Sequence, residues 1–160
     1  MHIFTTGGTI DKIYFDAQSE FQIGEPQISR LLHEANVNFT YQVTSLLKKD
    51  SLDMDDADRA LIKEAVHGCS EQHILITHGT DTMVQTAQAI GELQNKTVVL
   101  VGAMQPARII ASDAVYNIGF ASAACQLLPA GVYIAMNGEI FRPDDVAKDR
   151  TTMSFKKTST

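Results

Sequence analysis

The stretch ILITHGTDTMVQTAQAI, residues 74–90, decides the fold class of this chain of 160 residues. It opens with a short apolar run, Ile74 to Thr77, turns at Gly79, and continues from about Asp81 with apolar residues at helical spacing. An apolar run of this length is typical of a strand buried on both faces, as in a parallel sheet. The stretch therefore predicts a strand followed by a covering helix.

The same alternation of strand and helix extends over most of the chain. The expected strands are His2–Thr5, Thr40–Leu46, Ile74–Thr77, Val98–Val101 and Val132–Ala135. The expected helices run over residues 26–35, from about 55 to 68, from 81 to just before 94, and 112–127. In the second helix the expected buried face consists of Ala57, Leu61, Ile62 and Ala65. We expect a single α/β domain over residues 1–160, with a mostly parallel sheet and helices on both faces in a three-layer Rossmann-like or flavodoxin-like arrangement.

Two stretches depart from this alternation. Residues 10–24 mix aromatic with polar side chains, which predicts a hairpin or mobile flap near the N-terminus. Residues 137–160 open with a turn at Asn137 and Gly138, hold one short strand near Ile140, and end in polar residues expected to fray.

Composition excludes several classes of function. A net charge of −6 argues against binding the phosphate backbone of nucleic acids. The N-terminus lacks a basic region followed by an apolar one, and no run of about 18 apolar residues occurs, so we expect a cytoplasmic protein without membrane contact. Cys69 and Cys125 lack CxxC spacing and read as buried free thiols, and the five histidines show no HxH or HExxH pattern. No metal site is expected.

Three predicted strands end in turns rich in glycine and threonine. These turns are TTGGT at residues 5–9, HGTDT at 78–82 and GAM at 102–104. In an open parallel sheet, ligands bind beyond the carboxyl ends of the strands. Ordinary turn chemistry explains any one of these loops, but three convergent loops predict a site for a small ligand. Nucleotides are disfavoured, because neither GxGxxG nor GxxxxGK[ST] is present and Asp11 would repel phosphate.

A threonine hydroxyl becomes a nucleophile only when a neighbouring group takes its proton. The candidate bases are His78, Lys148 and Tyr14. His78 lies between an apolar strand and a glycine, which favours a hydrogen-bonded structural histidine. Lys148 lies among Asp144, Asp145 and Asp149, and without other information this pattern favours a solvated lysine in an acidic turn.

Four motifs carry a specific resemblance to a known family. They are TGGTI (Thr6–Ile10), ITHGTDTM (Ile76–Met83), VGAMQP (Val101–Pro106) and DVAK (Asp145–Lys148). In this order, and over nearly the whole chain, they resemble the bacterial L-asparaginase family in a short-chain, single-domain form. The resemblance implies hydrolysis of L-asparagine to L-aspartate and ammonia by a threonine nucleophile, with no cofactor.

The resemblance also assigns catalytic roles. Thr9 would be the primary nucleophile, and Tyr14 on the flap would close over the substrate and help to move the proton of Thr9. Thr80 would be the second catalytic threonine, with Lys148 as its partner. Asp81 would hold the α-ammonium group of the substrate.

Further positions match substrate-binding residues of the family. Ser51 matches the residue that binds the α-carboxylate, and Ala103 the one whose backbone carbonyl faces the departing amide nitrogen. Backbone N–H groups around Gly8 and Thr80 would bind the oxyanion. Leu52 stands where larger periplasmic members have glutamine, which removes one polar contact.

Larger members of the family have a second, C-terminal domain and assemble as dimers of dimers. Without that domain, we expect weaker substrate binding and a homodimer or homotetramer. Two alternatives remain open. One is a glutaminase-like amidohydrolase, and the other is an amino-acid-binding or regulatory module derived from the enzyme.

Overall fold

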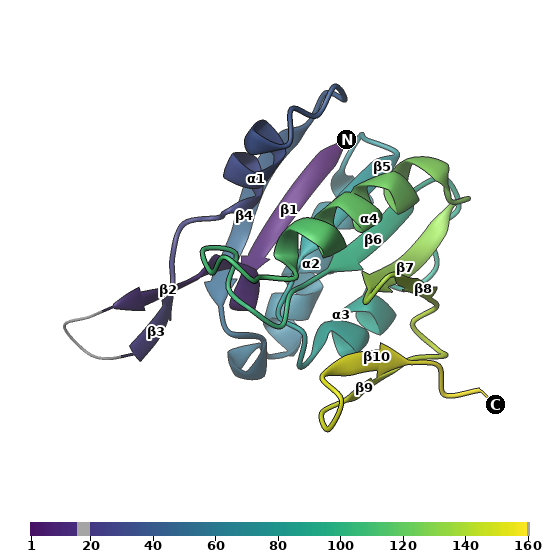
Figure 1. Ribbon diagram of the computed structural model, residues 1–160. Helices are drawn as coiled ribbons and strands as arrows, with labels where there is room; N and C mark the ends of the chain where they lie inside the picture. The colour runs from purple at the N-terminus through teal and green to yellow at the C-terminus, as the bar shows by residue number, and fades with distance from the viewer. Residues whose placement is uncertain (16–19, 160) are drawn as a thin grey trace.

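The computed structural model describes residues 1–15 and 20–159, and its centre is a six-stranded sheet (Figure 1). In spatial order its strands are β4 (Gln42–Lys49), β1 (His2–Gly7), β5 (His73–Thr77), β6 (Thr97–Val101), β7 (Gly131–Met136) and β8 (Glu139–Phe141). The first five are parallel, and β8 runs antiparallel to β7. Numbered along the chain, the parallel strands lie in the order 2-1-3-4-5. The expected mostly parallel, flavodoxin-like sheet is confirmed.

Four α-helices of the described residues cover the two faces of this sheet. They are α1 (Ile28–Glu34), α2 (Asp56–Gly68), α3 (Met83–Ile90) and α4 (Ala114–Leu127). Helices α1 and α4 lie on one face, and α2 and α3 pack together on the other (Figure 1). Their bounds agree with the sequence prediction to within a few residues. No helix in the described residues is both long and apolar enough to cross a membrane.

Burial of the strands follows their place in the sheet. All residues of β6 and β7 are buried, because helices cover both of their faces. In β4, at one edge, no residue is fully buried, and exposed residues are interspersed with half-buried ones. The apolar runs of the sequence therefore mark the centre of the sheet.

Helix α2 buries a different face from the predicted one. Its buried residues are Asp58, Ile62 and Val66. Ala57 and Leu61 are exposed, so the prediction was wrong at these two positions. The physical reason is the burial of Ile62 and Val66 in the core, and Asp58, on the same stripe, pairs with Lys49 at 2.8 Å. The helix is rotated so that Ile62 and Val66 follow Asp58 on one stripe.

A hairpin leaves the body of the molecule after β1. Its strands, β2 (Lys12–Phe15) and β3 (Glu20–Ile23), pair antiparallel, which confirms a hairpin within residues 10–24. Figure 1 shows it extending away from the sheet. Residues 16–19, between the two strands in sequence, lie outside the described residues.

The C-terminal segment is more ordered than its composition suggests. Strands β9 (Ala147–Asp149) and β10 (Ser154–Lys156) form a second hairpin, which the sequence did not reveal. After it, the carboxylate of Asp145 accepts hydrogen bonds from the backbone N–H groups of Thr158 and Ser159 at 3.1 and 2.7 Å. The prediction of fraying was therefore wrong for these two residues, because a carboxylate thirteen and fourteen residues away in sequence binds them. Thr160 lies outside the described residues.

Candidate active site

The loops that follow β1, β4, β5 and β6 pack against one another through glycines. A Cβ atom at Gly8 would lie 2.4 Å from the backbone nitrogen of Gly79, and one at Gly79 would lie 2.5 Å from the Oγ of Ser51. A Cβ at Gly102 would lie 2.7 Å from the carbonyl oxygen of His78. Strand β1 is flanked by β4 and β5, the point where the strand order reverses and where such sheets bind ligands. The three predicted loops do converge there, and the loop after β4 joins them.

Thr80 and Lys148 meet at this edge of the sheet. The Nζ of Lys148 donates to the Oγ1 of Thr80 at 2.7 Å and to the Oδ1 of Asp81 at 2.9 Å. Only 11% of the Lys148 side chain is exposed, so the alternative of a solvated lysine does not hold. The Nη2 of Arg150 lies 3.7 Å from the same Oδ1 of Asp81. Hairpin β9–β10 carries Lys148 into this position, in register with the buried Phe155.

His78 is fully buried and bonded on both sides of its ring. Its Nδ1 lies 2.8 Å from the carbonyl oxygen of Gly79, and its Nε2 lies 2.8 Å from the Oγ1 of Thr86 on α3. Burial lowers the pKa of His78 to about 4. A neutral ring that donates from Nδ1 and accepts at Nε2 satisfies both contacts. The geometry is that of a histidine that shapes the loop of Thr80.

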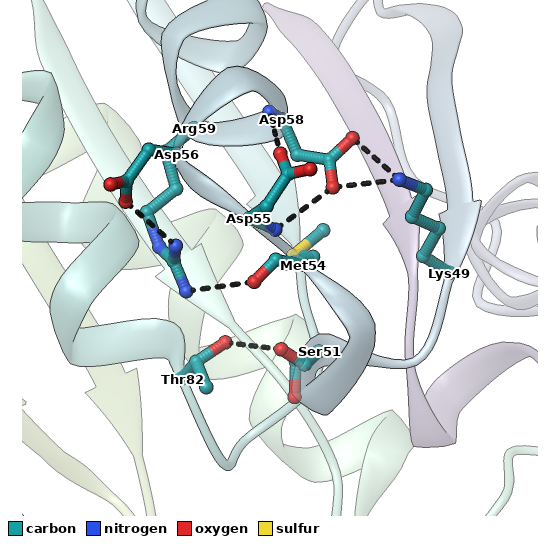
Figure 2. A network of polar contacts seen from close by, with 8 residues as sticks. All are labelled: Lys49, Ser51, Met54, Asp55, Asp56, Asp58, Arg59 and Thr82. Atoms are coloured by element: carbon teal, nitrogen blue, oxygen red, sulfur yellow. Dashed lines mark hydrogen bonds and ion pairs between the residues drawn. The ribbon is translucent and has the colours of Figure 1, made fainter.

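Ser51 begins a 3-10 turn after β4, and its side chain is buried. Its Oγ has no hydrogen-bond partner within the described residues. The backbone of this turn is held by Thr82, whose Oγ1 donates to the carbonyl oxygen of Ser51 at 2.7 Å (Figure 2). A buried hydroxyl without a partner is a free donor for a ligand oxygen.

Charged side chains brace the segment that follows Ser51 (Figure 2). Asp58 and Asp55 cap α2 reciprocally, and Lys49 donates to both oxygens of Asp58 at 2.8 and 2.9 Å. Arg59 donates to the carbonyl oxygen of Met54 at 3.3 Å. This network fixes both ends of the turn that presents Ser51.

Thr9 and Tyr14 are not brought together in this structure. Thr9 opens a 3-10 turn directly after Gly8 and is half-buried. Tyr14 lies on β2, is 54% exposed, and packs edge-on against Phe21 with ring centroids 5.5 Å apart. No hydrogen bond joins Tyr14 to Thr9 in the described part of the chain. The hairpin stands in an open position relative to the loops (Figure 1).

A salt bridge ties the foot of this hairpin to the loop after β4. The Nζ of Lys12 lies 2.6 Å from the Oδ2 of Asp50. Burial opposes ionisation of Asp50, yet the hydrogen bonds from Lys12 and from the backbone of Leu52 hold its pKa below the ordinary value. This pair is not predictable from the sequence, because nothing in the spacing of residues 12 and 50 links them.

The loop after β6 lies against Thr80 and is held from α4. Ala103 is fully buried, and the Oγ1 of Thr80 donates to the Sδ of Met104 at 3.9 Å. Behind the loop lie Asp113 and Asn117, which the sequence analysis missed. The sequence does contain a signal for this pair. Asp113 and Asn117 are polar residues four positions apart at the start of a helix that contains no charged residue.

The described residues contain no group of three or more His, Cys, Asp or Glu side chains that could hold a metal ion. Cys69 and Cys125 are free thiols; Cys125 is buried as predicted, whereas the prediction was wrong for Cys69, which is only partly buried. The chemistry available at this edge is that of threonine hydroxyls, one lysine and one carboxylate.

The family model for the asparaginase N-terminal domain matches residues 1–158. The chain belongs to the asparaginase family. It is similar to a probable periplasmic L-asparaginase of Haemophilus influenzae, with 34% identity over 94% of this chain and 46% of that protein. It is also similar to a glutaminase-asparaginase of Acinetobacter glutaminasificans, with 33% identity over 77% of this chain and 38% of that protein.

Among solved structures, a probable cytoplasmic L-asparaginase from Campylobacter jejuni resembles it with a TM-score of 0.83. The identity is 27%, over 99% of this chain and 52% of that one. The chain thus spans about half the length of these asparaginase relatives.

Proposed function

We propose that this chain hydrolyses the side-chain amide of free L-asparagine to L-aspartate and ammonia. The observation that carries the proposal is the contact of Lys148 with both Thr80 and Asp81, at the loop edge of an asparaginase-family domain. A cation that donates to a threonine oxygen lowers the cost of negative charge on that oxygen. The proposed reaction needs no metal or cofactor.

The proposed reaction proceeds through an acyl-enzyme ester. The Oγ of Thr9 attacks the amide carbon, the new C–O bond forms a tetrahedral oxyanion, and the C–N bond breaks as nitrogen leaves with a proton as ammonia. Water then attacks the ester carbon, and the Oγ of Thr9 leaves and recovers its proton. Backbone N–H groups near Gly8 and Thr80 would bind the oxyanion. Tyr14 would take part in proton movement once the hairpin closes from its open position.

Recognition of the amino acid would use both charged ends of the substrate. The Oδ1 of Asp81 already faces Lys148 and Arg150, which leaves Oδ2 for the α-ammonium group. The unpartnered Oγ of Ser51 would donate to the α-carboxylate. The carbonyl oxygen of Ala103 would accept from the departing nitrogen.

Ammonia release from L-asparagine tests the proposal. We expect turnover by the wild type and by Thr40→Ala, a threonine control on the exposed surface. Thr9→Ala should lose at least about 10³-fold in kcat, because no other hydroxyl replaces the nucleophile. Equal activity of Thr9→Ala and the wild type would overturn the nucleophile assignment. A wild type that binds asparagine without turnover would favour the amino-acid-binding module.

Glutamine is a second candidate substrate, since one relative is named a glutaminase-asparaginase. The extra methylene moves the carbonyl carbon away from the nucleophile, so we expect a lower kcat/KM for glutamine. Competition between the two amides in one assay measures this ratio.

We also propose the cytoplasm as the location of the protein, as for the Campylobacter relative by its name. Fractionation of the source cells tests this location.

A further inference from the structure

Asp113 gathers three hydrogen-bond donors around one carboxylate. The backbone N–H of Met104 donates to its two oxygens at 2.9 and 3.0 Å, and that of Gln105 donates at 3.0 Å. The Nδ2 of Asn117, one helical turn later, donates to Asp113 at 2.9 Å. Two of the three donors belong to the loop after β6. Asp113 therefore acts on the backbone of a loop that lies against Thr80.

The side chain of Asp113 faces the loop after β6, and the neighbouring Ser112 caps α4. Asp113 is the N-cap residue of α4, where an aspartate ordinarily accepts from the first free N–H groups of its own helix. Its side chain makes no such capping bond, and its backbone is helical, with φ −75° and ψ −5°. The Oγ of Ser112 accepts from Ala114 instead, at 3.0 Å. The helix is therefore capped without Asp113, whose carboxylate is committed to the loop after β6.

Asn117 completes the contact from the next turn of the helix. It is buried, and the same Nδ2 donates to the carbonyl oxygen of Gly102 at 3.1 Å. The pair thus binds the carbonyl before Ala103 and two N–H groups after it. A Cβ at Gly102 would lie 2.8 Å from the Cγ2 of Thr80, so the absence of a side chain lets the loop lie this close to the threonine.

We propose that Asp113 and Asn117 are positioning residues for the reaction. They hold the loop after β6 so that the carbonyl of Ala103 and the sulfur of Met104 stay against Thr80 and the amide nitrogen of the substrate. The role rests on the proposed hydrolysis of asparagine. A purely structural role would change the melting temperature and leave kcat of the folded protein unchanged. A positioning role lowers kcat without a matching rise in KM.

The test is the kcat and KM of Asp113→Asn, Asn117→Ala and the double variant. We expect each single variant to lower kcat by about 10- to 100-fold, as misplaced reacting groups do. KM should stay within about threefold of the wild type. The double variant should be no slower than the slower single one, because the two residues act on one loop. Additive losses, or unchanged kcat, would overturn the proposal.

Thr97→Val is the matched control for lost stability. Thr97 lies at the opposite end of β6, is buried, and donates to the carbonyl oxygens of Leu128 and Pro129 at 3.0 and 3.2 Å. Its loss should lower the melting temperature while kcat stays at the wild-type level. A fall in kcat as large as that of Asp113→Asn would mean that lost stability explains both, and would overturn the positioning role.

Amide hydrogen exchange tests the contacts without relying on activity. In Asp113→Asn and Asn117→Ala, the amides of Met104 and Gln105 should exchange at least about tenfold faster, while those of Val99 and Leu100 keep their protection. Unchanged protection of Met104 and Gln105 would overturn the contact itself. A wild type without amidase activity would instead overturn the proposed function. The exchange rates of the Met104 and Gln105 amides would then decide by themselves whether Asp113 and Asn117 hold the loop.

Discussion

Single residues at the loop edge show how charge is arranged before any substrate arrives. Lys148 holds both a hydroxyl and a carboxylate, and Arg150 adds a second cation near Asp81. A substrate ammonium group that binds Asp81 would therefore share its carboxylate with Lys148 and Arg150. Since charge-assisted contacts are strong and directional, Asp81 should control affinity more than rate.

Asp81→Asn tests this separation of affinity from rate. We expect KM for asparagine to rise by about 10- to 100-fold, the equivalent of a charge-assisted contact of roughly 1.5 to 3 kcal/mol. The measurement is the initial rate against asparagine concentration. Glu34→Gln, which removes an exposed carboxylate paired with Arg30 on α1, serves as the charge-matched control. An unchanged KM in Asp81→Asn would move ammonium recognition to another residue.

Two buried groups, Asp11 and His78, make the free energy of unfolding change with pH in opposite directions. Burial raises the pKa of Asp11 to about 6, above its ordinary value of 3.8, so the folded state binds this proton more tightly than the unfolded state does. Its contribution to stability therefore falls as pH rises from about 4 to 6. Burial lowers the pKa of His78 to about 4 from 6.5, so its contribution is lost as pH falls through that window. The two slopes offset each other.

In Asp11→Asn, the pH dependence of the free energy of unfolding should show the contribution of His78 without the opposing contribution of Asp11. Relative to the wild type, we expect the variant to gain roughly 2 kcal/mol in free energy of unfolding at pH 7 and nothing at pH 4. The asparagine can still accept from the backbone N–H of Gln27, which donates to Asp11 at 2.8 Å. Urea denaturation of both proteins from pH 4 to 7 provides the comparison. Parallel curves across this range would contradict the assignment to Asp11.

Among the structural elements, the loops after β1, β4, β5 and β6 behave as one packed unit. Gly8 is essential to this packing, since its φ of +86° and the backbone of Gly79 both exclude a side chain. The hairpin β9–β10 carries Lys148 to this edge from outside the sheet, whereas Tyr14 on β2–β3 remains exposed. The site therefore depends on elements that lie outside the alternating strands and helices.

Gly8→Ala should disrupt the packed loops. We expect a loss of at least about 2 kcal/mol in free energy of unfolding, because alanine strains this backbone and meets Gly79. The control is Gly119→Ala on the outer face of α4, where a Cβ meets no atom within 4 Å. That change should stabilise by roughly 0.5 to 1 kcal/mol through helix propensity. Chemical denaturation measures both, and a Gly8→Ala protein as stable as the wild type would refute the packing argument.

At the scale of the whole molecule, we predict self-association as a homodimer or homotetramer. Closed symmetric assemblies are the commonest form of soluble oligomers. One chain has a mass of 17.5 kDa, so light scattering after size-exclusion chromatography should report about two or four times this value. A mass that stays at one chain across protein concentrations would contradict the prediction.

The sequence by itself determined the sheet, the helices and the threonine loops. Apolar runs such as Val98–Val101 and the glycine turns at Gly7, Gly8 and Gly79 have local causes, namely burial on two faces and close backbone approach. The motifs added the pairing of Thr80 with Lys148, and the structure places these two side chains in contact.

Tertiary structure decided the contacts that have no local cause. Helix α2 turns Ile62 and Val66 into the core and pairs Asp58 with Lys49, and Ser159 is bound by Asp145, fourteen residues away. The hydrogen bond that Asp113 accepts from the backbone N–H of Met104 likewise joins the loop after β6 to the start of α4. Such bonds form only where folding brings residues that are far apart in sequence close together. The periodicity of the sequence contains no information about these distances.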